Sequence, residues 1–521
     1  MARTPIAAAL GRIVSCVADS MQGEPGNAAA GPARRTVLKG AGALAAGLAV
    51  PAVTALPAGA APSAGGAAPR ILVVGAGLAG LSAAYQLKNA GYTSTVIEAS
   101  DRVGGRCWTV DGYFADGQVA EHGGELIDQG HTSIRQLAQS LGLQLDNLLS
   151  AEQNGTEPIY FFDGAPYTYD EATEDIKAIW QQLHSDVSAA SYPTTYLIST
   201  PRGRELDQMS ITTWITNYVP GGMSSRLGQL LDVAYNIEYG GECSVQSSLN
   251  MLYLLAYSGQ GQLRIFGPSN EKYHVRGGNE QITDRMADVL GGDIELGTRL
   301  MALAQKSDGT WTVTTRTGKV TSSRDADHVV LALPFSLLRS VDLSKAGFPA
   351  LKTTAIKQLA MGTNSKLQLQ FTDRHWRSLG GNGDTFSDRG YQSSWEVTRA
   401  QPGVQGILVD YTGGTIGASF TGSPEAHART FLGQIEPVFP GISRKWNGKV
   451  VLDFWKAHPW TLGSYSYWKV GQYTAFSGVE GEPVGTCHFA GEHTSQDFQG
   501  YLNGAVETGY RAAGEILAAL K

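Results

Sequence analysis

The chain has 521 residues, of which 42% are hydrophobic and 17% charged, and its formal net charge at pH 7 is −7. This length is enough for two domains with a large core, and the acidic balance argues against a nucleic-acid-binding function. Cys107, Cys243 and Cys487 are widely spaced without C-x-x-C pairing and the ten histidines are scattered, so we expect neither a disulfide framework nor a metal site.

Residues 1–60 resemble a twin-arginine export signal. The pair Arg34-Arg35 precedes a mildly apolar stretch at 40–56, and Ala-Gly-Ala at 58–60 forms a small-residue cleavage site. The resemblance implies the twin-arginine translocase as a partner, with secretion or release into a periplasm-equivalent space. A membrane anchor needs ~20 strongly apolar residues, and this stretch is too rich in glycine and alanine. Residues 61–69 then form a linker.

A phosphate-binding loop follows the linker. A β-rich apolar run at 71–74 leads into G-x-G-x-x-G, formed by Gly75, Gly77 and Gly80, and a helix of small apolar residues is predicted over 78–87. The glycines allow a tight turn, a close approach of the backbone to a pyrophosphate and close packing of the helix on the strand. The start of the helix presents free N–H groups to the phosphates. This pattern predicts a dinucleotide site.

The residues after the loop distinguish the kind of dinucleotide. A second predicted strand, 95–97, ends in Glu98, placed 23 residues after Gly75 to bind a ribose. The string ASDRVGGRCWT comes next, and it resembles the extended fingerprint of the flavin-containing amine oxidase superfamily. The resemblance implies FAD instead of a nicotinamide cofactor, with Arg106 binding the FAD pyrophosphate.

The C-terminal segment CHFAGEHTSQDFQGYLNGAVETGYRAAGEIL has a predicted strand at 488–490 and a helix that starts after Gly500. By itself it could be an amphipathic helix that only packs. It resembles the closing motif of the same superfamily, which implies that the helix start at Tyr501 and Leu502 points at the flavin C2 carbonyl. The resemblance also implies that Glu492 accepts a hydrogen bond from a ribityl hydroxyl.

The middle of the chain matches the superfamily as well, with a buried strand at 329–333. We therefore expect an α/β fold, a two-domain flavoprotein with a Rossmann-type FAD-binding domain and a substrate domain of mixed sheet plus helices. Because FAD would contact both ends of the chain, it would have to be captured before export of the folded protein. The expected FAD-binding domain is discontinuous (70–125, 266–345 and 476–521), and the substrate domain comprises 126–265 and 346–475.

Lys366 opens the alternating strand in GTNSKLQLQFTDRHW. A lysine at the start of a strand is ordinarily a solvated charge. The resemblance to monoamine and polyamine oxidases implies instead that Lys366 holds a water against flavin N5, where it would serve proton handling or oxygen activation.

An aromatic cage is the second feature that the resemblance implies. Tyr465 and Tyr501 align with its two walls, which confine an amine before the flavin. Ordinary packing is the alternative for both rings. Ser464 stands where monoamine oxidases carry the cysteine that anchors the flavin, so FAD is expected to be noncovalent.

The segment VAEHGGELIDQGH bears on the substrate. In L-amino-acid oxidases an arginine that clamps the carboxylate stands at the position of Leu126, and an alkyl group cannot take that role. Asp128 falls where some plant polyamine oxidases place a glutamate that attracts a distal ammonium. Asp128-Gln129-Gly130 is equally suited to a turn or a helix cap, and the sequence leaves both interpretations open.

We therefore expect an exported FAD-dependent amine oxidase that uses O2. It would convert a primary amine or polyamine to an imine and aldehyde, releasing hydrogen peroxide and ammonia or a shorter amine. A homodimer is among the assemblies we consider. The rival hypotheses are an L-amino-acid oxidase with a relocated carboxylate-binding arginine, a non-amine flavin oxidoreductase, and a flavin-loaded binding protein without turnover.

Overall fold

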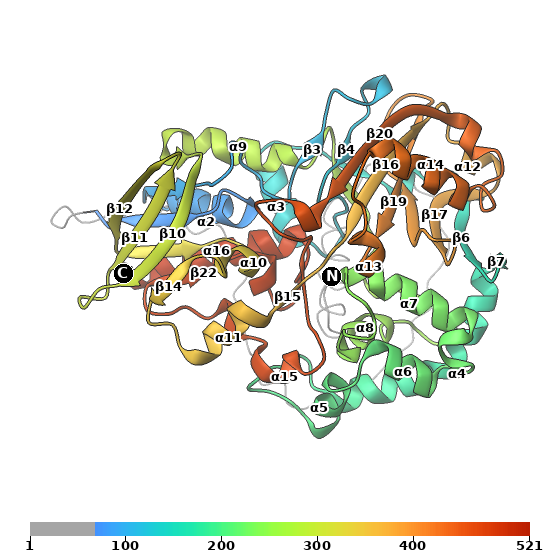
Figure 1. The fold of residues 1–521 in the computed structure, drawn as a ribbon, viewed down its shortest axis with the longest axis horizontal. Helices are drawn as coiled ribbons and strands as arrows, with labels where there is room; N and C mark the ends of the chain where they lie inside the picture. Colours follow the sequence, from blue (N-terminus) through green and yellow to red (C-terminus); the bar gives the residue numbers. More distant parts are fainter. Residues whose placement is uncertain (1–67) are drawn as a thin grey trace, which may run out of the picture.

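The computed structural model describes residues 68–521, so the expected export signal and nearly all of the linker lie outside the described residues. Figure 1 shows two parts side by side: a parallel sheet with its helices, and a larger mixed sheet above a group of helices. This arrangement confirms the expected α/β class. In the described part of the chain, every helix is too short or too polar to cross a membrane.

The first part is built on a five-stranded parallel sheet in the order β22-β13-β1-β2-β9. Its central strand β1 has the sequence ILVV and is buried at all four positions, as expected for a parallel strand covered on both faces. A second sheet, in the order β12-β11-β10-β14, packs beside it. The strands are β1 (Ile71–Val74), β2 (Ser94–Ile97), β9 (Ile294–Glu295), β13 (His328–Leu331), β22 (Cys487–Phe489), β10 (Thr298–Gln305), β11 (Trp311–Thr317), β12 (Val320–Ala326) and β14 (Asp342–Lys345).

The helices of this part hold the two ends of the chain together. The backbones approach closely where α2 meets α16, because a Cβ added at Gly509 of α16 would lie 2.3 Å from the carbonyl oxygen of Ala79 in α2. Strand β22 joins the sheet beside β13, so the C-terminal segment completes a sheet begun by β1. The helices are α2 (Leu78–Asn89), α3 (Thr132–Ser140), α9 (Glu280–Leu290), α10 (Phe335–Leu338) and α16 (Leu502–Ala519).

Residues 126–147 differ from the expected division of the chain. We placed them in the substrate domain, but α3 packs its buried Ile134 and Leu137 into the same core as β1 and α2. Strand β5 (Leu145–Asn147) pairs with β8 (Tyr273–Val275), which leads into α9. The periodicity of α3 predicts a buried face but does not say which domain covers it.

The second part is built on a seven-stranded sheet in the order β20-β16-β19-β18-β17-β6-β7. Five of its strands come from residues 346–475, the second segment of the expected substrate domain. The first segment, residues 126–265, supplies the group of helices from α4 to α8. The strands are β6 (Glu157–Phe162), β7 (Ala165–Tyr167), β16 (Ser365–Phe371), β17 (Gly381–Ser387), β18 (Ser393–Glu396), β19 (Gly406–Thr412) and β20 (Trp446–Phe454). The helices are α4 (Tyr169–Ala189), α5 (Pro201–Asp207), α6 (Ile211–Tyr218), α7 (Arg226–Tyr239), α8 (Ser248–Leu255), α11 (Ala350–Gln358), α12 (His375–Ser378), α13 (Gly414–Gly417), α14 (Pro424–Ile435) and α15 (Gln472–Phe476).

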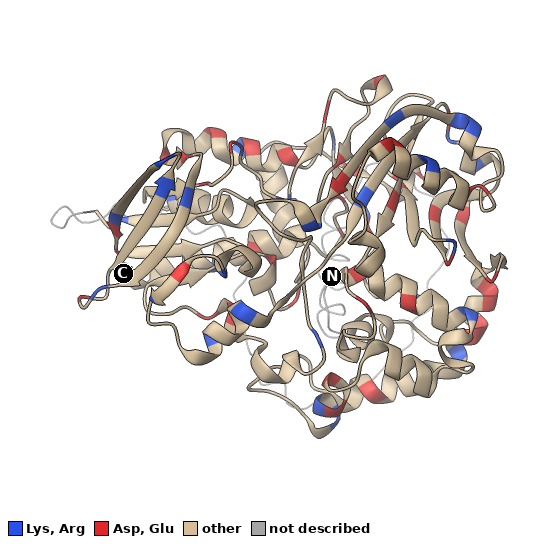
Figure 2. Cartoon of the chain, viewed as in Figure 1, with Lys and Arg blue, Asp and Glu red and all other residues tan. Residues whose placement is uncertain are grey.

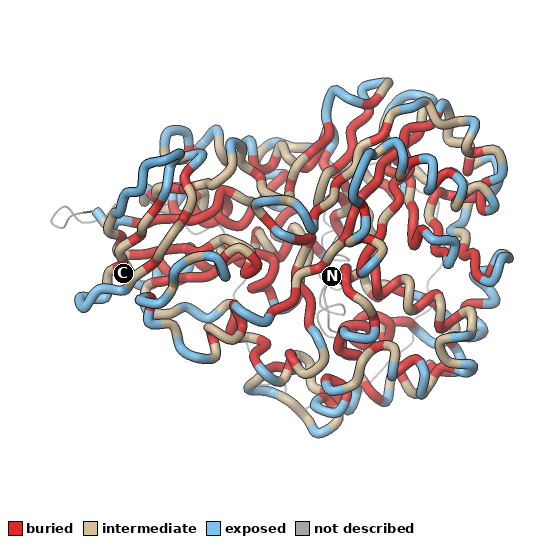
Figure 3. The backbone as a smooth tube through the Cα atoms, viewed as in Figure 1, coloured by how far each residue is buried: buried red, intermediate tan, exposed pale blue. Residues whose placement is uncertain are grey.

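The buried residues follow the central strands of both parts, which appear as red tube in Figure 3. Strand β16 is buried at all seven positions, including the polar ones. Lysine, arginine, aspartate and glutamate are interspersed over the outer elements (Figure 2). Among the polar residues of β16, Lys366 lines the cavity described next.

Candidate active site

A cavity of about 1190 Å³ lies between the two parts. One end is formed by the loop between β1 and α2 and by the start of α16, and the other by β16, β18 and β19 of the seven-stranded sheet. This volume exceeds the ≈300–1,000 Å³ of ordinary ligand pockets, so it has room for a dinucleotide and a substrate. The predicted site residues that line it are Gly75, Gly77, Glu98, Arg106, Leu126, Lys366, Tyr465, Glu492, Tyr501 and Leu502.

The three glycines of the fingerprint have different surroundings. Gly75 has a φ of +103°, and a Cβ added there would lie 2.9 Å from the carbonyl oxygen of Ala332. A Cβ on Gly80 would lie 1.9 Å from the carbonyl oxygen of Gly75, so this glycine permits close packing and does not line the cavity. A Cβ on Gly77 would meet no heavy atom within 4 Å. Gly77 therefore borders open space in which a phosphate group fits.

Two helices begin at the cavity. Helix α2 starts after Gly77 and α16 after Tyr501, and neither N-cap residue makes a side-chain hydrogen bond to the helix. Leu502, the first residue of α16, lines the cavity. The first N–H groups of a helix and its dipole favour negative charge, so both ends suit an anionic cofactor.

Glu98 follows β2 at the same end of the cavity. Its carboxylate accepts hydrogen bonds from the backbone N–H of Ala76 and of Ser100, both at 2.8 Å. A carboxylate has about four acceptor sites, so Glu98 keeps capacity for ribose hydroxyls. The two backbone bonds fix the carboxylate beside the glycine loop.

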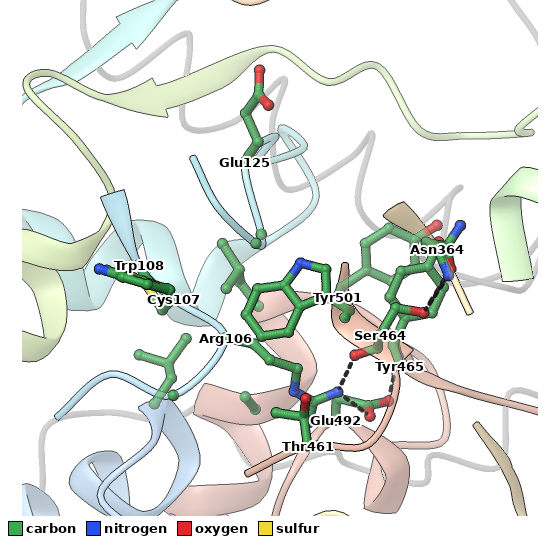
Figure 4. Close-up of a pocket in the computed structure, with 18 of the residues that line it drawn as sticks. Arg106, Cys107, Trp108, Glu125, Asn364, Thr461, Ser464, Tyr465, Glu492 and Tyr501 are labelled. Atoms are coloured by element: carbon green, nitrogen blue, oxygen red, sulfur yellow. Dashed lines mark hydrogen bonds and ion pairs between the residues drawn. The ribbon is translucent and has the colours of Figure 1, made fainter. Parts of the chain in front are cut away.

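Arg106 and Glu492 form an ion pair at 2.8 Å (Figure 4). Arg106 also donates to the carbonyl oxygen of Ser464 at 2.7 Å. Burial alone would raise the pKa of Glu492, but the positive charge of Arg106 and the hydrogen bonds from Arg106 and Ser466 together outweigh burial and lower the pKa. Glu492 further accepts from the hydroxyl of Ser466 at 2.8 Å and from the N–H of Gly500 at 2.9 Å. Glu492 thus ties Arg106 to the segment that leads into α16, and its acceptance of a ribityl hydroxyl stays a prediction.

The hydroxyl of Ser464 is engaged within the protein. It donates to Oδ1 of Asn364 at 2.6 Å and accepts from the N–H of Asn364 at 3.3 Å. Both groups line the cavity, as Figure 4 shows. A hydroxyl held in this way offers no thiol for a covalent flavin bond.

Tyr465 and Tyr501 both line the cavity, and each hydroxyl is fixed. The hydroxyl of Tyr465 donates its hydrogen to the carbonyl oxygen of Ile237 at 3.0 Å. In the hydrogen bond of 2.8 Å between the two tyrosine hydroxyls, Tyr411 is therefore the donor and Tyr465 the acceptor. Tyr501 donates to the carboxylate of Glu238. Burial raises the pKa of Tyr465 and of Tyr501 well above the usual value, so both phenols stay neutral.

Lys366 lies at the substrate end of the cavity and is 3% exposed. Its ammonium donates to Glu125 Oε2 at 2.7 Å and to the carbonyl oxygens of Glu121 at 2.7 Å and Gly123 at 3.3 Å. These three acceptors match the three hydrogens of the ammonium. The predicted contact with a water at flavin N5 would therefore compete with protein acceptors. The structure excludes a solvated lysine.

Glu125 completes this arrangement. Its other oxygen accepts from Nε1 of Trp395 at 3.0 Å, and the ring of Trp395 lies 5.7 Å from the Lys366 ammonium. Burial is the largest influence on the pKa of Glu125 and would raise it, but the Lys366 charge together with the hydrogen bonds from Lys366 and Trp395 outweighs burial, and the pKa is lowered. Lys366 and Glu125 therefore form a buried, charged pair at the cavity wall.

Leu126 and Asp128 have different positions. Leu126 lines the cavity, whereas Asp128 is 4% exposed and lies behind the cavity wall. Asp128 Oδ1 accepts from the hydroxyl of Ser269 and from the N–H groups of Asn270 and Glu271, at 2.7, 3.0 and 2.7 Å. This geometry favours the structural interpretation of Asp128, as a group that organises a loop. Binding of an ammonium by Asp128 is not supported by its placement.

Several cavity residues were missed by sequence reasoning. Tyr411 lies opposite Lys366 in the register of β19 on β16, and Glu238 reaches the cavity from the end of α7. Glu125 belongs to the segment VAEHGGELIDQGH, where it is a single acid between a glycine pair and Leu126. This setting was the signal by which Glu125 could have been found. Arg399 lines the cavity from the turn after β18. Neither Arg399 nor Glu238 belongs to a pattern with a specific spacing.

The parallel sheet, the open space at Gly77, the two helix starts and the ribose-binding acid together fit FAD. A fold with this cofactor site, joined to a buried substrate end with tyrosines and a lysine, defines an FAD-dependent oxidoreductase. A family model described as flavin containing amine oxidoreductase matches residues 78–517. The chain belongs to this family, and its cofactor is FAD.

Curated relatives and solved structures agree with this assignment. The chain is 26% identical over 474 residues to a flavin-containing amine oxidase of Danio rerio, with 86% of each chain covered. It is 26% identical to polyamine oxidase 1 of Zea mays and 27% identical to an L-amino acid dehydrogenase of Synechocystis, covering 86% of this chain and 90% and 95% of theirs. A putrescine oxidase bound to putrescine superposes with a TM-score of 0.72 at 24% identity, covering 87% of this chain and 99% of that one. A cyclohexylamine oxidase from Brevibacterium oxydans gives 0.75 at 22%, covering 87% and 100%.

Proposed function

We propose that this flavoenzyme oxidises a primary amine or polyamine with O2. The products are an imine that hydrolyses to an aldehyde, hydrogen peroxide, and ammonia or a shorter amine. The observation that carries the proposal is the pair Tyr465 and Tyr501, with Tyr411 behind, at the end of the cavity that also holds the carboxylate of Glu238. Neutral rings next to a carboxylate suit the amine group of a substrate.

The residues of the chain bind and orient the substrate. The carboxylate of Glu238 attracts the amine into the cage, and the faces of Tyr465 and Tyr501 confine it in one orientation. Because burial keeps both phenols neutral, the cage adds no negative charge of its own. The ion pair of Lys366 with Glu125 supplies a fixed dipole at the cavity wall, on the strand next to Tyr411.

When bound, FAD accepts the two electrons of the substrate C–H bond and passes them to oxygen. The protein would hold its pyrophosphate at Gly77, Arg106 and the start of α2, and its ribose at Glu98. Leu502 and the start of α16 would face the flavin end. We infer that the flavin is noncovalent, because Ser464 has no thiol.

Export by the twin-arginine route is a further part of the proposal, carried by the Arg34-Arg35 pair and the cleavage site. Replacing both arginines by lysine should leave the protein inside the cell. Appearance of the variant outside the cell at the level of the unchanged chain would refute this route. A homodimer is proposed as an assembly to be tested by light scattering.

The relatives include amine oxidases and an amino acid dehydrogenase, so the family does not decide the amine. The test of the proposal is a peroxide assay on purified yellow protein with putrescine, spermidine, tyramine and several amino acids. Anaerobic mixing with the best of these should bleach the flavin within a turnover. A colourless protein that takes up no FAD, or a yellow one that no amine bleaches, would overturn the proposal.

A further inference from the structure

Arg399 is a buried cation in the cavity wall that the proposed chemistry does not use. It is 4% exposed and lines the cavity from the turn that follows β18. Its Nη1 pairs with Oε1 of Glu152 at 3.1 Å, and its Nε donates to the carbonyl oxygen of Glu396 at 3.1 Å. Its Nη2 has no hydrogen-bond partner.

An unsatisfied N–H on a buried guanidinium is costly, because a charged donor has lost water and gained nothing. Arg374, from the same region, shows how a structural arginine is satisfied. Its three nitrogens donate to Glu396 at 2.8 Å, to Gly403 O at 2.7 Å, and to the carbonyls of Thr398 and Gln401 at 3.3 and 3.1 Å. The difference leaves Nη2 of Arg399 as a buried donor without a partner, in a residue that lines the cavity.

The charges around the cavity favour an acidic group at this place. The Lys366 ammonium is fully engaged by Glu125 and two carbonyls, which leaves Arg399 as the buried cation with a spare donor. Burial raises the pKa of the neighbouring Glu271 to about 8 and that of Asp384 to about 6. Glu271 is therefore largely neutral at pH 7. The negative charges left to oppose an anion are Asp384, the 30% exposed Glu152, and Glu125, whose charge is balanced by Lys366.

We propose that Arg399 binds the carboxylate of an amine substrate that also carries one, so that the cavity accepts an amino acid in preference to the matching amine. The proposal rests on the amine oxidation proposed above and names the substrate class. A guanidinium is the side chain best suited to a carboxylate, because its planar donors match the two oxygens. Leu126 cannot serve this function, and Arg399 supplies the charge from the turn after β18.

The experiment compares matched pairs that differ by a carboxylate: tyrosine with tyramine, and lysine with cadaverine. For the unchanged enzyme we expect kcat/KM to be higher for the amino acid of at least one pair. Arg399→Met should lower the amino-acid value by about 10- to 100-fold, the size of a lost charge-assisted hydrogen bond, and change the amine value by less than about threefold. Arg399→Lys should restore part of the difference.

Arg264 provides the matched control, because it is an exposed arginine that lines the same cavity. Arg264→Met should leave the ratio of amino acid to amine unchanged. The proposal would be overturned if Arg264→Met, and not Arg399→Met, removed the higher kcat/KM of the amino acid over its amine. It would also be overturned if the unchanged enzyme had equal kcat/KM values for the two members of every pair.

A binding measurement separates failure of this inference from failure of the proposed function. Benzoate and its neutral analogue benzamide are titrated into the FAD-loaded protein, and the shift of the thermal midpoint is recorded. Benzoate should bind at least tenfold more tightly than benzamide, and Arg399→Met, or Arg399→Gln if the former does not retain FAD, should abolish the difference. Equal binding of the two probes refutes the inference even if amines are oxidised. Benzoate preference without oxidation of any amine refutes only the proposed function.

Discussion

The pair of Lys366 and Glu125 allows a prediction whose size follows from the structure. The two side chains are 4% and 6% exposed, and their charged atoms lie 2.7 Å apart. Lys366→Met leaves the Glu125 carboxylate buried with only the Trp395 indole as a donor. Removing one partner of a buried pair costs about 3–5 kcal/mol, because the remaining charge has no counter-charge.

Glu125→Gln should be milder. The Lys366 ammonium would keep the carbonyl oxygens of Glu121 and Gly123 as acceptors. The double variant removes both charges and should be more stable than Lys366→Met alone, since no buried charge is left unpaired. We therefore expect the unchanged chain to be the most stable, followed by Glu125→Gln, and Lys366→Met to be the least stable. The double variant should be more stable than Lys366→Met.

The assay is the thermal unfolding midpoint of FAD-loaded protein at a fixed FAD concentration, because bound cofactor shifts the midpoint by mass action. pH gives a second readout. In the unchanged chain the pKa of Glu125 is lowered, so its contribution is present above the unfolded pKa of about 4.3 and is lost as pH falls through the folded value. In Lys366→Met burial is opposed only by the Trp395 hydrogen bond and the charge of His274, so we expect the pKa of Glu125 to rise and the stability to be lost as pH rises. The variant should therefore lose more stability at pH 8 than at pH 5. Additive effects of the two single changes, or a deficit that does not grow with pH, would refute the ion pair.

Four further experiments test the site. Gly77→Val should give a folded protein that does not retain FAD, because the valine side chain would fill the open space at this position. Gly80→Val should impair folding itself, because Cβ would lie 1.9 Å from a carbonyl oxygen. Flavin absorbance reports FAD retention and circular dichroism reports folding, so the two measurements distinguish the two variants. Acid precipitation of the unchanged chain should release all flavin to the supernatant, and flavin retained in the pellet would contradict the role assigned to Ser464. Tyr465→Leu should lower kcat/KM for the best amine by about tenfold or more, because the ring confines the substrate. Tyr465→Phe keeps the ring and should lower kcat/KM by less. Equal effects of the two changes would mean that the hydroxyl is the important group. Lys366→Met should also slow turnover about tenfold or more, and an unchanged rate would remove its role in the reaction.

The cofactor end of the site could be predicted from the sequence because its geometry is local. A strand, a glycine turn, a helix and a second strand fold into one arrangement, and this places Gly77 and Glu98 at the same edge. The second half of the cofactor site, at Glu492 and Tyr501, was placed by resemblance. Glu492 and Tyr501 are far from Gly77 and Glu98 in the chain, and local sequence patterns do not show that they meet in the fold.

The substrate end shows where sequence reasoning stopped. Lys366 and Tyr465 were found by resemblance, but the partner of Lys366 lies 241 residues away in the chain. Asp128 and Glu125 stand three positions apart in one segment, and only the fold turns Glu125 toward the cavity and Asp128 toward the loop at 269–271. Residues 126–147 were assigned to the other domain because an amphipathic helix does not identify the core that covers it.

By itself, the sequence determined the dinucleotide loop and its acid, since these follow from short-range spacing and backbone sterics, whereas the α/β class was expected from the resemblance. The tertiary structure alone decided which buried charges face each other: Glu125 with Lys366, and Arg399 with a spare donor in the cavity. The physical reason is that the energy of a buried charge depends on its partners in space, and those partners come from strands whose pairing is set by the packing of the whole chain.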